Sequence, residues 1–291
     1  MNEFDIVLVG HVAKDIIVIG DKREEVAGGG AYYGSIALAH LGFRVAVVTK
    51  LREADFWIVR EMEEEGVTVF ASPTPETSGI ENVYLTPDME RRETRPLGFA
   101  GPFSRDEIPD LKTRLWDVTP LMAGEVDLPM LRWLAERGRL ALDAQGFVRV
   151  RRGDELVFED WPDKRVGLPL VDFLKVDAAE AEVLTGLADI HEAAKTLAEM
   201  GAGEVVLTHN KGLLVVAEGH EYEANFRFTS LAGRTGRGDT CFSVYLGWRL
   251  DHPPDEASKV AAAVTSLKVA VPGPWRGTWK DVAEKIGKQS L

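Results

Sequence analysis

The sequence predicts an α/β fold in which a central, mostly parallel sheet carries helices on both faces. Two observations lead to this prediction. Short apolar runs of the kind that form buried strands alternate with stretches in which apolar residues recur at helical spacing, and the loops between them are short. The length of 291 residues also suits one large domain, so we expect residues 1–291 to fold as a single domain.

The elements follow one another in that alternation. The expected strands are short apolar runs, at 4–10, 44–49, 67–71, 139–143 and 204–209. The expected helices have helical spacing of their apolar residues, and they are at 32–41, 56–66, 128–138, 178–186, 191–201, 239–250 and 255–271. The tail that begins at residue 272 predicts a turn followed by a last helix.

Two segments depart from this rhythm. Residues 12–28 and 77–97 alternate apolar and polar side chains around turn signals such as Gly20-Asp21. That pattern predicts hairpins that do not belong to the parallel sheet. Because a few strands projecting from an α/β core could cover a binding site, we expect these two segments to form a small lid of β-strands.

Composition limits the partners that this chain can have. A net charge of −13 and a pI near 5.0 repel polyanions, so we expect neither a nucleic acid nor an anionic membrane as partner. No apolar run approaches the roughly 18 residues of a membrane span. Cys241 is the sole cysteine, which excludes an intrachain disulfide and fits a reducing compartment. The acidic first residues lack the basic region of a secretory signal, so we expect a cytoplasmic protein.

The sharpest local signal is the stretch GRTGRGDTC at 233–241, which opens an amphipathic helix. Gly236 and Gly238 allow backbone conformations and close approaches that other residues do not. The first turn of a helix leaves amide N–H groups unpaired, and the helix dipole adds partial positive charge there. A transferring phosphoryl group could therefore bind at this turn, with Asp239 placed to accept the proton of an attacking hydroxyl. The alternative is a glycine-rich turn in which an Asp or Thr only caps the helix.

A second group of glycines, Gly28, Gly29 and Gly30, precedes another expected helix. Together with Gly34, their spacing matches a G-x-G-x-x-x-G variant of the dinucleotide fingerprint, but that fingerprint should directly follow a buried strand, and here it follows a charged turn. We therefore expect their amides to receive a polyhydroxy ligand rather than a dinucleotide. Asp15 comes just beyond the first expected strand, and its carboxylate could accept two sugar hydroxyls. The alternative for Asp15 is an exposed acid in a loop.

The stretch GRTGRGDTCFSVYL resembles the signature of the ribokinase/PfkB family of carbohydrate kinases, usually written D-T-x-G-A-G-D. The early Asp15, the three glycines and this late signature occur in the family's order and roughly at its spacing, so the resemblance covers essentially the whole chain. It implies a ribokinase-like fold with a central sheet, flanking helices and a small β lid. It also implies Mg-ATP as the donor, with a sugar held between lid and sheet.

The resemblance implies a role for each matching residue. Asp239 would be the catalytic base, and the amides of Gly236, Arg237 and Gly238 would form an anion hole. The residues expected to contact the acceptor, two of them chosen for their polar side chains near the sheet edge and the lid, are Asp15, Gly29, Gly30, Asn82 and Gln145. A simple turn residue is the alternative for Gln145.

The resemblance also implies a donor site. The residues expected to contact ATP are Thr208, Gly212, Thr235, Gly236 and Gly238, and the segment 272–275 is expected at the edge of the adenine pocket. The segment VDAAEAEVL resembles the family's N-x-x-E motif, which makes Asp177 and Glu180 candidates for holding Mg²⁺ indirectly, through water.

Three departures from the family pattern bear on this site. Gly233 stands where the family has its first Asp, which puts a monovalent-cation site there in doubt. Arg237 replaces the usual Ala and adds a guanidinium that could reach a phosphate or an acidic substrate. Asp177 replaces Asn, so the local charge is more negative and could favour closer association of a divalent ion.

The stretch GGGAYYGSIALA and the segment DAQGF at 143–147 look most like the branch of the family that contains myo-inositol kinases and kinases of inositol breakdown. We therefore expect an ATP-dependent phosphotransferase that acts on a hydroxyl of a small polyol or sugar, with myo-inositol or an inositol-derived keto sugar favoured. A nucleoside kinase of the same fold and a sugar- or nucleotide-binding sensor without turnover are the alternatives. Lid strands often pair between subunits in this family, so a homodimer through the lid is a further expectation.

Overall fold

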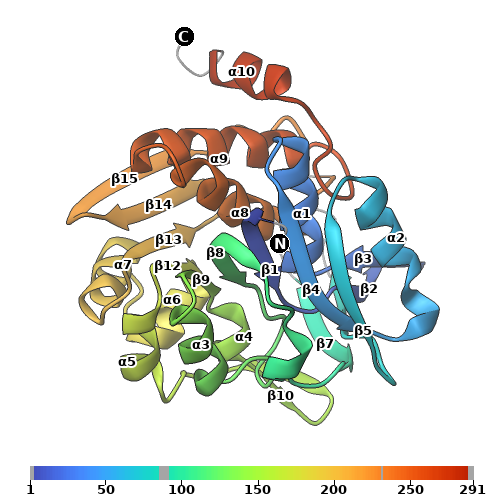
Figure 1. Ribbon diagram of the computed structural model, residues 1–291. Coiled ribbons are helices and arrows are strands. Elements are labelled where there is room, and N and C mark those ends of the chain that lie inside the picture. Colours follow the sequence, from blue (N-terminus) through green and yellow to red (C-terminus); the bar gives the residue numbers. More distant parts are fainter. Residues whose placement is uncertain (1–2, 85–91, 231, 288–291) are drawn as a thin grey trace.

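The computed structural model describes residues 3–84, 92–230 and 232–287, which form a large central sheet, a smaller four-stranded sheet and two layers of helices (Figure 1). Every strand and helix expected from the sequence is present within a few residues of its expected bounds. That residues 1–291 form a single domain stays a prediction. Within the described ranges, no helix is both long and apolar enough to span a bilayer.

The central sheet has nine strands in the order β15-β14-β13-β12-β9-β8-β1-β4-β5. The strands from β13 to β5 in this order pair in parallel, and β14 and β15 add an antiparallel edge. The expected mostly parallel sheet is therefore confirmed. Its strands are β1 (Glu3–Val9), β4 (Val45–Leu51), β5 (Thr68–Pro73), β8 (Lys112–Val118), β9 (Arg139–Asp143), β12 (Phe173–Asp177), β13 (Glu204–Thr208), β14 (Gly212–Ala217) and β15 (His220–Asn225).

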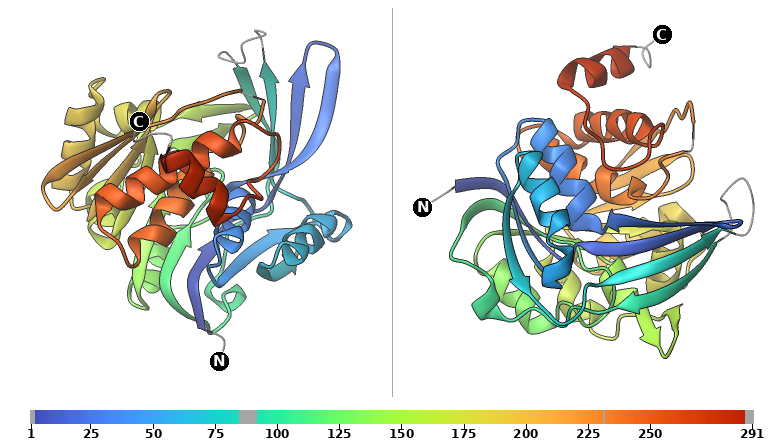
Figure 2. Two further views of the ribbon diagram at one scale, coloured as in Figure 1. Left: turned by 90° about the horizontal axis from the view of Figure 1, so that it is seen from above. Right: turned by 90° about the vertical axis from the view of Figure 1, so that its right-hand side faces the viewer.

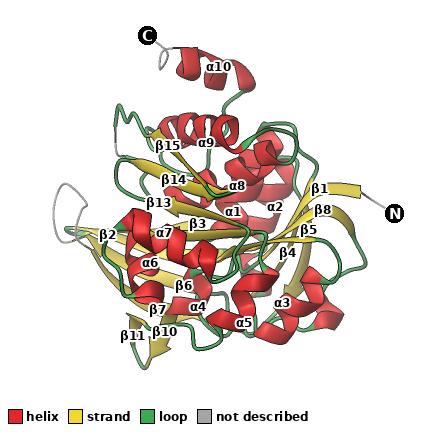
Figure 3. Ribbon diagram, turned by 90° about the vertical axis from the view of Figure 1, so that its left-hand side faces the viewer, coloured by secondary structure: helices red, strands yellow, loops and turns green. Residues whose placement is uncertain are grey.

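Helices cover both faces of this sheet, as the fold class requires (Figure 3). One face packs against α1 (Gly30–His40), α2 (Trp57–Glu64), α8 (Arg237–Arg249) and α9 (Pro254–Lys268), and α10 (Trp279–Gly287) lies on the outer side of α9 (Figure 1). The other packs against α3 (Leu128–Ala135), α4 (Gln145–Val148), α5 (Lys164–Gly167), α6 (Ala178–Thr185) and α7 (Ile190–Glu199). Alternate side chains of β1 supply the two cores: Ile6 and Leu8 point into the first, and Val7 and Val9 into the second.

The smaller sheet has the strand order β3-β2-β6-β7 and projects from one side of the central sheet (Figure 2). Its strands are β2 (Ala13–Ile19), β3 (Lys22–Gly28), β6 (Gly79–Tyr84) and β7 (Arg92–Gly98). The two expected hairpins are therefore confirmed, although residues 85–91 of the second lie outside the described residues. The hairpins join through a parallel pair, in which Ile17 of β2 stands opposite Asn82 of β6. That this sheet acts as a lid, or pairs with a second copy, stays a prediction.

Several strands escaped sequence analysis because charged residues interrupt their apolar pattern. The strand β12 contains Lys175, which is only 4% exposed, and β8 contains Asp117, which is fully buried. A charged residue in such a run is expected to face water, so neither run is read as a buried strand. A further hairpin, β10 (Arg149–Arg152) with β11 (Glu155–Phe158), carries mainly charged and half-exposed residues.

A buried polar contact fastens α8 to the central sheet. The carboxylate of Glu204 on β13 accepts a hydrogen bond of 2.6 Å from the Tyr245 hydroxyl. It also accepts three from the Arg249 guanidinium, at 2.8, 3.0 and 3.3 Å. Both donors lie on α8, whose first turn forms part of the cavity described below.

We predict that Glu204→Ala lowers the free energy of unfolding by about 3 kcal/mol, because it leaves a buried hydroxyl and a half-buried guanidinium without their acceptor. Urea denaturation measures this loss. The matched control is Glu221→Ala on β15, where an exposed carboxylate pairs with Lys195 at 2.7 Å. That control should cost less than about 1 kcal/mol, and equal losses in both variants would contradict the prediction.

Candidate active site

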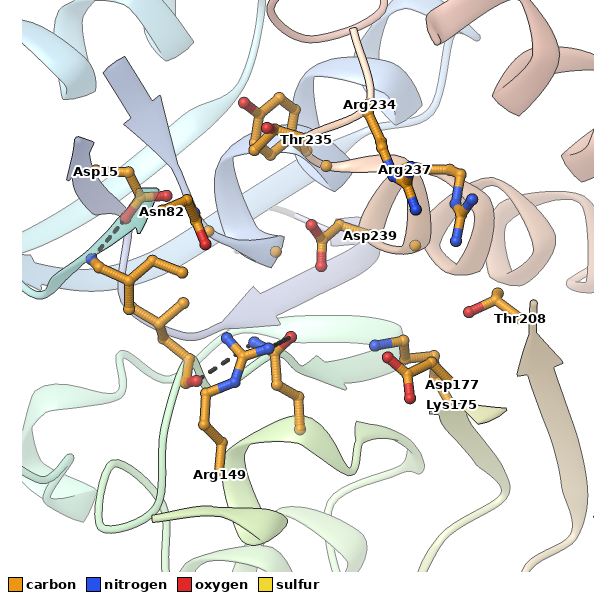
Figure 4. Close-up of a pocket in the computed structure, with 18 residues that line it drawn as sticks. Asp15, Asn82, Arg149, Lys175, Asp177, Thr208, Arg234, Thr235, Arg237 and Asp239 are labelled. Atoms are coloured by element: carbon orange, nitrogen blue, oxygen red, sulfur yellow. Dashed lines mark hydrogen bonds between the residues drawn. The ribbon is translucent and has the colours of Figure 1, made fainter. Parts of the chain in front are cut away.

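A cavity of about 270 Å³ lies where the carboxyl ends of the central strands, the small sheet and the first turn of α8 come together (Figure 4). Figure 4 places Asp239 in the middle of the labelled residues, between Asp15 and Asn82 on one side and Arg237 and Thr208 on the other. The cavity is therefore built from chain segments that are far apart in sequence.

The glycine motif forms the turn that starts α8. Gly236 is the residue before the helix and has a φ of +78°, a conformation that favours glycine. A Cβ at this position would also lie 2.3 Å from the ring of Tyr33, so no larger side chain fits. The amide of Arg237 donates to the carbonyl of Arg234 at 3.3 Å and so closes this turn. Asp239 lies in the first turn of the helix and lines the cavity.

The five residues expected to contact the acceptor all line the cavity: Asp15, Gly29, Gly30, Asn82 and Gln145. Asp15 lies within β2 of the small sheet, in the first expected hairpin, so the alternative of an exposed acid in a loop is wrong. It is 3% exposed, and its Oδ1 accepts a hydrogen bond of 2.9 Å from the Ile80 amide. Gln145 begins α4, and its side-chain amide donates to Leu121 O at 3.3 Å and accepts from Arg149 at 2.9 Å, while its contact with an acceptor stays a prediction.

On the donor side, the structure brings some of the expected residues to the cavity and not others. Thr208, Thr235, Gly236 and Gly238 line it. Gly212 does not: it lies in β14 opposite Asn225, where a Cβ would be 2.3 Å from the carbonyl of Ala224. The glycine at 212 is thus explained by the close approach of a neighbouring strand, and any contact with a nucleotide stays a prediction.

Asp177 and Glu180 cap the start of α6. The carboxylate of Asp177 accepts from the Glu180 amide at 2.8 Å, and the carboxylate of Glu180 accepts from the Asp177 amide at 2.7 Å. Asp177 lines the cavity, whereas Glu180 is fully buried beneath it. Among the described residues Glu180 Oε1 has no hydrogen-bond partner, so an oxygen is left over that suits a water of a hydrated divalent ion. These two residues therefore fit an indirect metal site.

Sequence analysis identified Arg237 among the cations that line this cavity but missed three others, Arg149, Lys175 and Arg234. Lys175 at the end of β12 is nearly buried, and its ammonium lies 3.0 Å from Asp143 and 3.5 Å from Glu180. Burial opposes its charge, but these two carboxylates outweigh burial and hold the pKa of Lys175 above its usual range. A lysine inside an otherwise apolar strand is the sequence signal that could have pointed to it.

Two further buried acids lie beneath Asp239. Burial, and then the negative charges of Asp143 and Asp239, raise the pKa of Asp117 far above its ordinary value. Burial also raises the pKa of Asp143, although the ammonium of Lys175 opposes this shift. Both acids thus interact electrostatically with Asp239, and Asp143 also pairs with the ammonium of Lys175. Burial raises the pKa of the Cys241 thiol to about 11, which makes it a neutral packing group.

A second buried polar cluster supports the cavity from behind. The carboxyl of Glu125 is fully buried and accepts hydrogen bonds from the amides of Leu121, at 2.7 Å, and His11, at 3.3 Å. Burial raises the pKa of Glu125 to about 8, although the amide donors pull it lower. Burial, together with Lys50, lowers the pKa of His11 to about 3, so this imidazole is neutral and pairs with the Ser78 hydroxyl at 2.7 Å.

The chain resembles known proteins along most of its length. The family model described as pfkB family carbohydrate kinase matches residues 1–280. The cytidine kinase of Thermococcus kodakarensis is 27% identical over 278 residues, which are 88% of this chain and 92% of that protein.

Solved structures add closer relatives. A pyrophosphate-dependent kinase in the ribokinase family, complexed with a pyrophosphate analog and myo-inositol, is 37% identical, with a TM-score of 0.89 over 96% of this chain and 99% of that one. A pyrophosphate-dependent myo-inositol-1 kinase, converted into a myo-inositol-3 kinase by two substitutions, is 36% identical, with a TM-score of 0.88 over 98% and 100%. Arabidopsis thaliana ribokinase, complexed with ribose and ATP, is 18% identical with a TM-score of 0.75 over 98% and 99%, and this likeness shows the fold alone.

The buried acid behind the cavity leads to a prediction about pH. In the folded protein Glu125 keeps a proton up to about pH 8, whereas in the unfolded chain it loses that proton near its ordinary pKa of 4.5. The contribution of Glu125 to stability should therefore fall as the pH rises through this window, by at most about 1.4 kcal/mol per pH unit. We predict that Glu125→Gln, which mimics the protonated acid, removes this negative slope, so that the free energy of unfolding of the variant rises relative to that of the wild type between about pH 5 and 8, as urea titrations at several pH values would measure.

Glu107→Gln is the matched control for that experiment. Burial favours the neutral form of Glu107, but hydrogen bonds from Lys50 and Ser104 outweigh it and hold its pKa below the usual range. This carboxyl is therefore ionised in both states over the window, so its substitution should shift the whole stability curve and leave the slope unchanged. An unchanged slope in Glu125→Gln would contradict the assignment of a protonated Glu125.

Proposed function

Because the chain belongs to the pfkB family of carbohydrate kinases, we propose that it transfers a phosphoryl group to a hydroxyl of a small polyol, with myo-inositol as the favoured acceptor. The observation that carries the proposal is the position of Asp239. Its carboxylate lies in the first turn of α8 and faces the same cavity as Asp15 and Asn82. A base, a helix terminus and hydroxyl-binding groups thus converge on one space.

Each side of the cavity has a part in the proposed transfer. Asp15, Asn82 and the amides of Gly29 and Gly30 would hold the hydroxyls of the acceptor. One hydroxyl would attack the terminal phosphorus of the donor and give its proton to Asp239. The bond between phosphorus and the bridging oxygen would break, and the leaving group would keep that electron pair. Positioning and charge stabilisation do most of the work in such a reaction, and a confined cavity supplies both.

The positive charge of the site suits the phosphate donor. The dipole of α8 points its positive end at the cavity, and Arg234 and Arg237 project from the same turn (Figure 4). A divalent cation, when bound, would supply further charge neutralisation on the phosphates. Asp177 and Glu180 would hold it through water, and Lys175 would keep that acidic corner from repelling the donor.

The acceptor assignment has support beyond the family. The small sheet places a carboxylate and a carboxamide side by side, and both groups hydrogen-bond hydroxyls well. Related chains that are 36–37% identical bind or phosphorylate myo-inositol. A nucleoside is the second candidate, because the curated relative at 27% identity is a cytidine kinase. We rank a nucleoside acceptor after a polyol because the cytidine kinase has a lower identity to this chain than the myo-inositol kinases do.

For the donor we favour inorganic pyrophosphate over the ATP expected from the sequence. Three solved relatives at 36–38% identity belong to pyrophosphate-dependent kinases. The cavity is small, and its described lining includes the cations Arg149, Lys175, Arg234 and Arg237, which would neutralise a compact polyanion. The segment 272–275, expected at the edge of an adenine pocket, contributes no residue to that lining, and its Trp275 is 3% exposed.

We predict that Asp239→Asn lowers kcat by about 10²–10⁴-fold while donor binding persists, because the amide cannot accept the hydroxyl proton. Phosphate release from pyrophosphate, or ADP release from ATP, measures turnover, and calorimetry measures donor binding. Asp189→Asn at the exposed start of α7 is the matched control, since it too is an aspartate at a helix N-terminus, and it should leave kcat within about twofold of the wild type. Near-normal turnover in Asp239→Asn would remove this residue from the role of base.

The donor preference predicts the outcome of a direct comparison. With myo-inositol as acceptor, kcat/KM should be higher for pyrophosphate than for ATP. Arg237→Met should lower the pyrophosphate value by about 10–100-fold, since a charged hydrogen bond of about 1.5–3 kcal/mol is lost. Arg152→Met, which breaks an exposed ion pair with Glu159, is the control and should have no such effect. ATP-driven turnover that exceeds turnover with pyrophosphate would restore the original donor, and binding of both ligands without turnover would favour a sensor.

A further inference from the structure

A lysine outside the mechanism described so far is buried beside the turn that starts α8. Lys268, the last residue of α9, has no exposed surface. Its ammonium donates hydrogen bonds to the carbonyl oxygen of Gly233, at 2.5 Å, and to that of Thr235. In a third direction it lies 4.8 Å from the centre of the Tyr33 ring, a distance at which a cation is attracted to an aromatic face. The partners of the buried ammonium are therefore two backbone carbonyls and one aromatic ring.

The two carbonyls belong to the turn that shapes the donor side of the cavity. Thr235 and Gly236, the two residues before α8, both line the cavity. The ammonium is thus one peptide unit away from the residue whose left-handed backbone starts the helix. Tyr33 couples the two further, because its ring packs against Gly236 while its face meets the ammonium. A displacement of Lys268 would consequently move the start of α8.

The sequence around this contact is matched to it. The amide of Gly233 donates to the carbonyl of Val269 at 2.9 Å, just beyond the end of α9. A Cβ at position 233 would lie 1.7 Å from the carbonyl oxygen of Val271, so only glycine lets the turn lie this close. Gly233, which stands where the family has an aspartate, therefore has a structural role of its own. Because it has no side chain, its carbonyl oxygen can reach the ammonium of Lys268.

The charges around Lys268 favour an ammonium in this position. Burial lowers the pKa of Lys268 to about 8, and the negative charge of Asp239 on α8 opposes that shift. The other charged groups at the start of α8 are Arg234 and Arg237, whose positive charges work against a second free cation there. Converging backbone carbonyls are also the ligands that proteins use to bind a potassium ion. The arrangement thus supplies a fixed cation where a mobile one would otherwise fit.

We propose that Lys268 is a resident cation: its ammonium takes the place of a monovalent metal ion on the carbonyls of Gly233 and Thr235, positions the turn before α8, and makes turnover independent of added K⁺ or Na⁺. The proposal rests on the kinase activity proposed above. Lys268 is a positioning residue, because it acts on the donor through the backbone of the turn and on Asp239 through the start of the helix.

The first test uses the wild-type protein. Initial rates with pyrophosphate and myo-inositol are measured in tetramethylammonium, sodium and potassium chloride at one ionic strength, since tetramethylammonium is too bulky to bind between two carbonyls. We expect the three rates to agree within twofold. A tenfold or larger increase in potassium would overturn the proposal. An absence of turnover with every donor and acceptor would instead count against the proposed function, and the readout of unfolding described below would then decide the present proposal.

The second test uses variants of Lys268. Lys268→Ala removes the ammonium and leaves room for an ion, so its kcat in tetramethylammonium should fall at least tenfold and recover in part with potassium or ammonium chloride. Lys268→Met keeps most of the side-chain volume without charge, so it should lose as much and should not recover. Lys259→Ala on the same helix is the control, because Lys259 is exposed and pairs only with Asp255 at 3.3 Å among the contacts described. It should match the wild type in every salt.

Thermal unfolding gives a readout that does not depend on turnover. Potassium chloride should raise the Tm of Lys268→Ala above its value in tetramethylammonium chloride, and it should leave the Tm of wild type, Lys268→Met and Lys259→Ala unchanged. This separates a cation site from a loss of packing, since a packing defect would respond to neither salt. Wild-type kcat in Lys268→Met, or an equal response to potassium in the Ala and Met variants, would overturn the proposal.

Discussion

The burial of one ammonium, that of Lys175, is the constraint on which the rest of the cavity depends. The parallel strands end at a common edge, and that edge gathers several carboxyl groups where water is largely excluded. Lys175 lies between Asp143 and Glu180, within 3.5 Å of both, and it limits the repulsion that would otherwise build up there. Asp177 and Asp239 can consequently share the same small space. Without this cation, the acidic edge would repel the phosphate groups that a kinase must bind.

The parts of this site that could be predicted from the sequence depend on residues that are close together in the sequence. The turn before α8 and the glycines before α1 are short stretches whose chemistry follows from adjacent residues, so GRTGRGD and GGG point to them directly. Asp239, Asp15 and Asn82 could be proposed because each lies next to such a stretch or within an alternating strand. The order of these stretches along the chain then indicated the fold class, since strands and helices alternate between them.

The parts that were not predictable depend on contacts between distant residues. Whether Lys175 faces water or the core is decided by the strands on either side of it, and Arg149 lines the cavity from a two-stranded sheet, β10 with β11, that no apolar pattern predicts. At Gly212 a motif suggested a ligand, and the structure adds a reason that the motif does not record: a neighbouring strand passes too close for a side chain, while the contact with a nucleotide stays a prediction. A one-dimensional pattern records which residue types are present, but the neighbours that set their protonation and exposure come from elsewhere in the chain.

The parallel pairing of β2 with β6 has a consequence for how the site would select its acceptor. Asp15 and Asn82 lie on these two adjacent strands, whose backbones are hydrogen-bonded to each other. If the small sheet shifts against the central one, both side chains travel together, and the spacing between them stays fixed by the register of the pair. The small sheet would therefore select an acceptor by the distance between two of its hydroxyls. This selection would precede, and would not depend on, the approach of either hydroxyl to Asp239. Discrimination among stereoisomers and closeness to the reacting phosphorus would thus be set by separate parts of the fold.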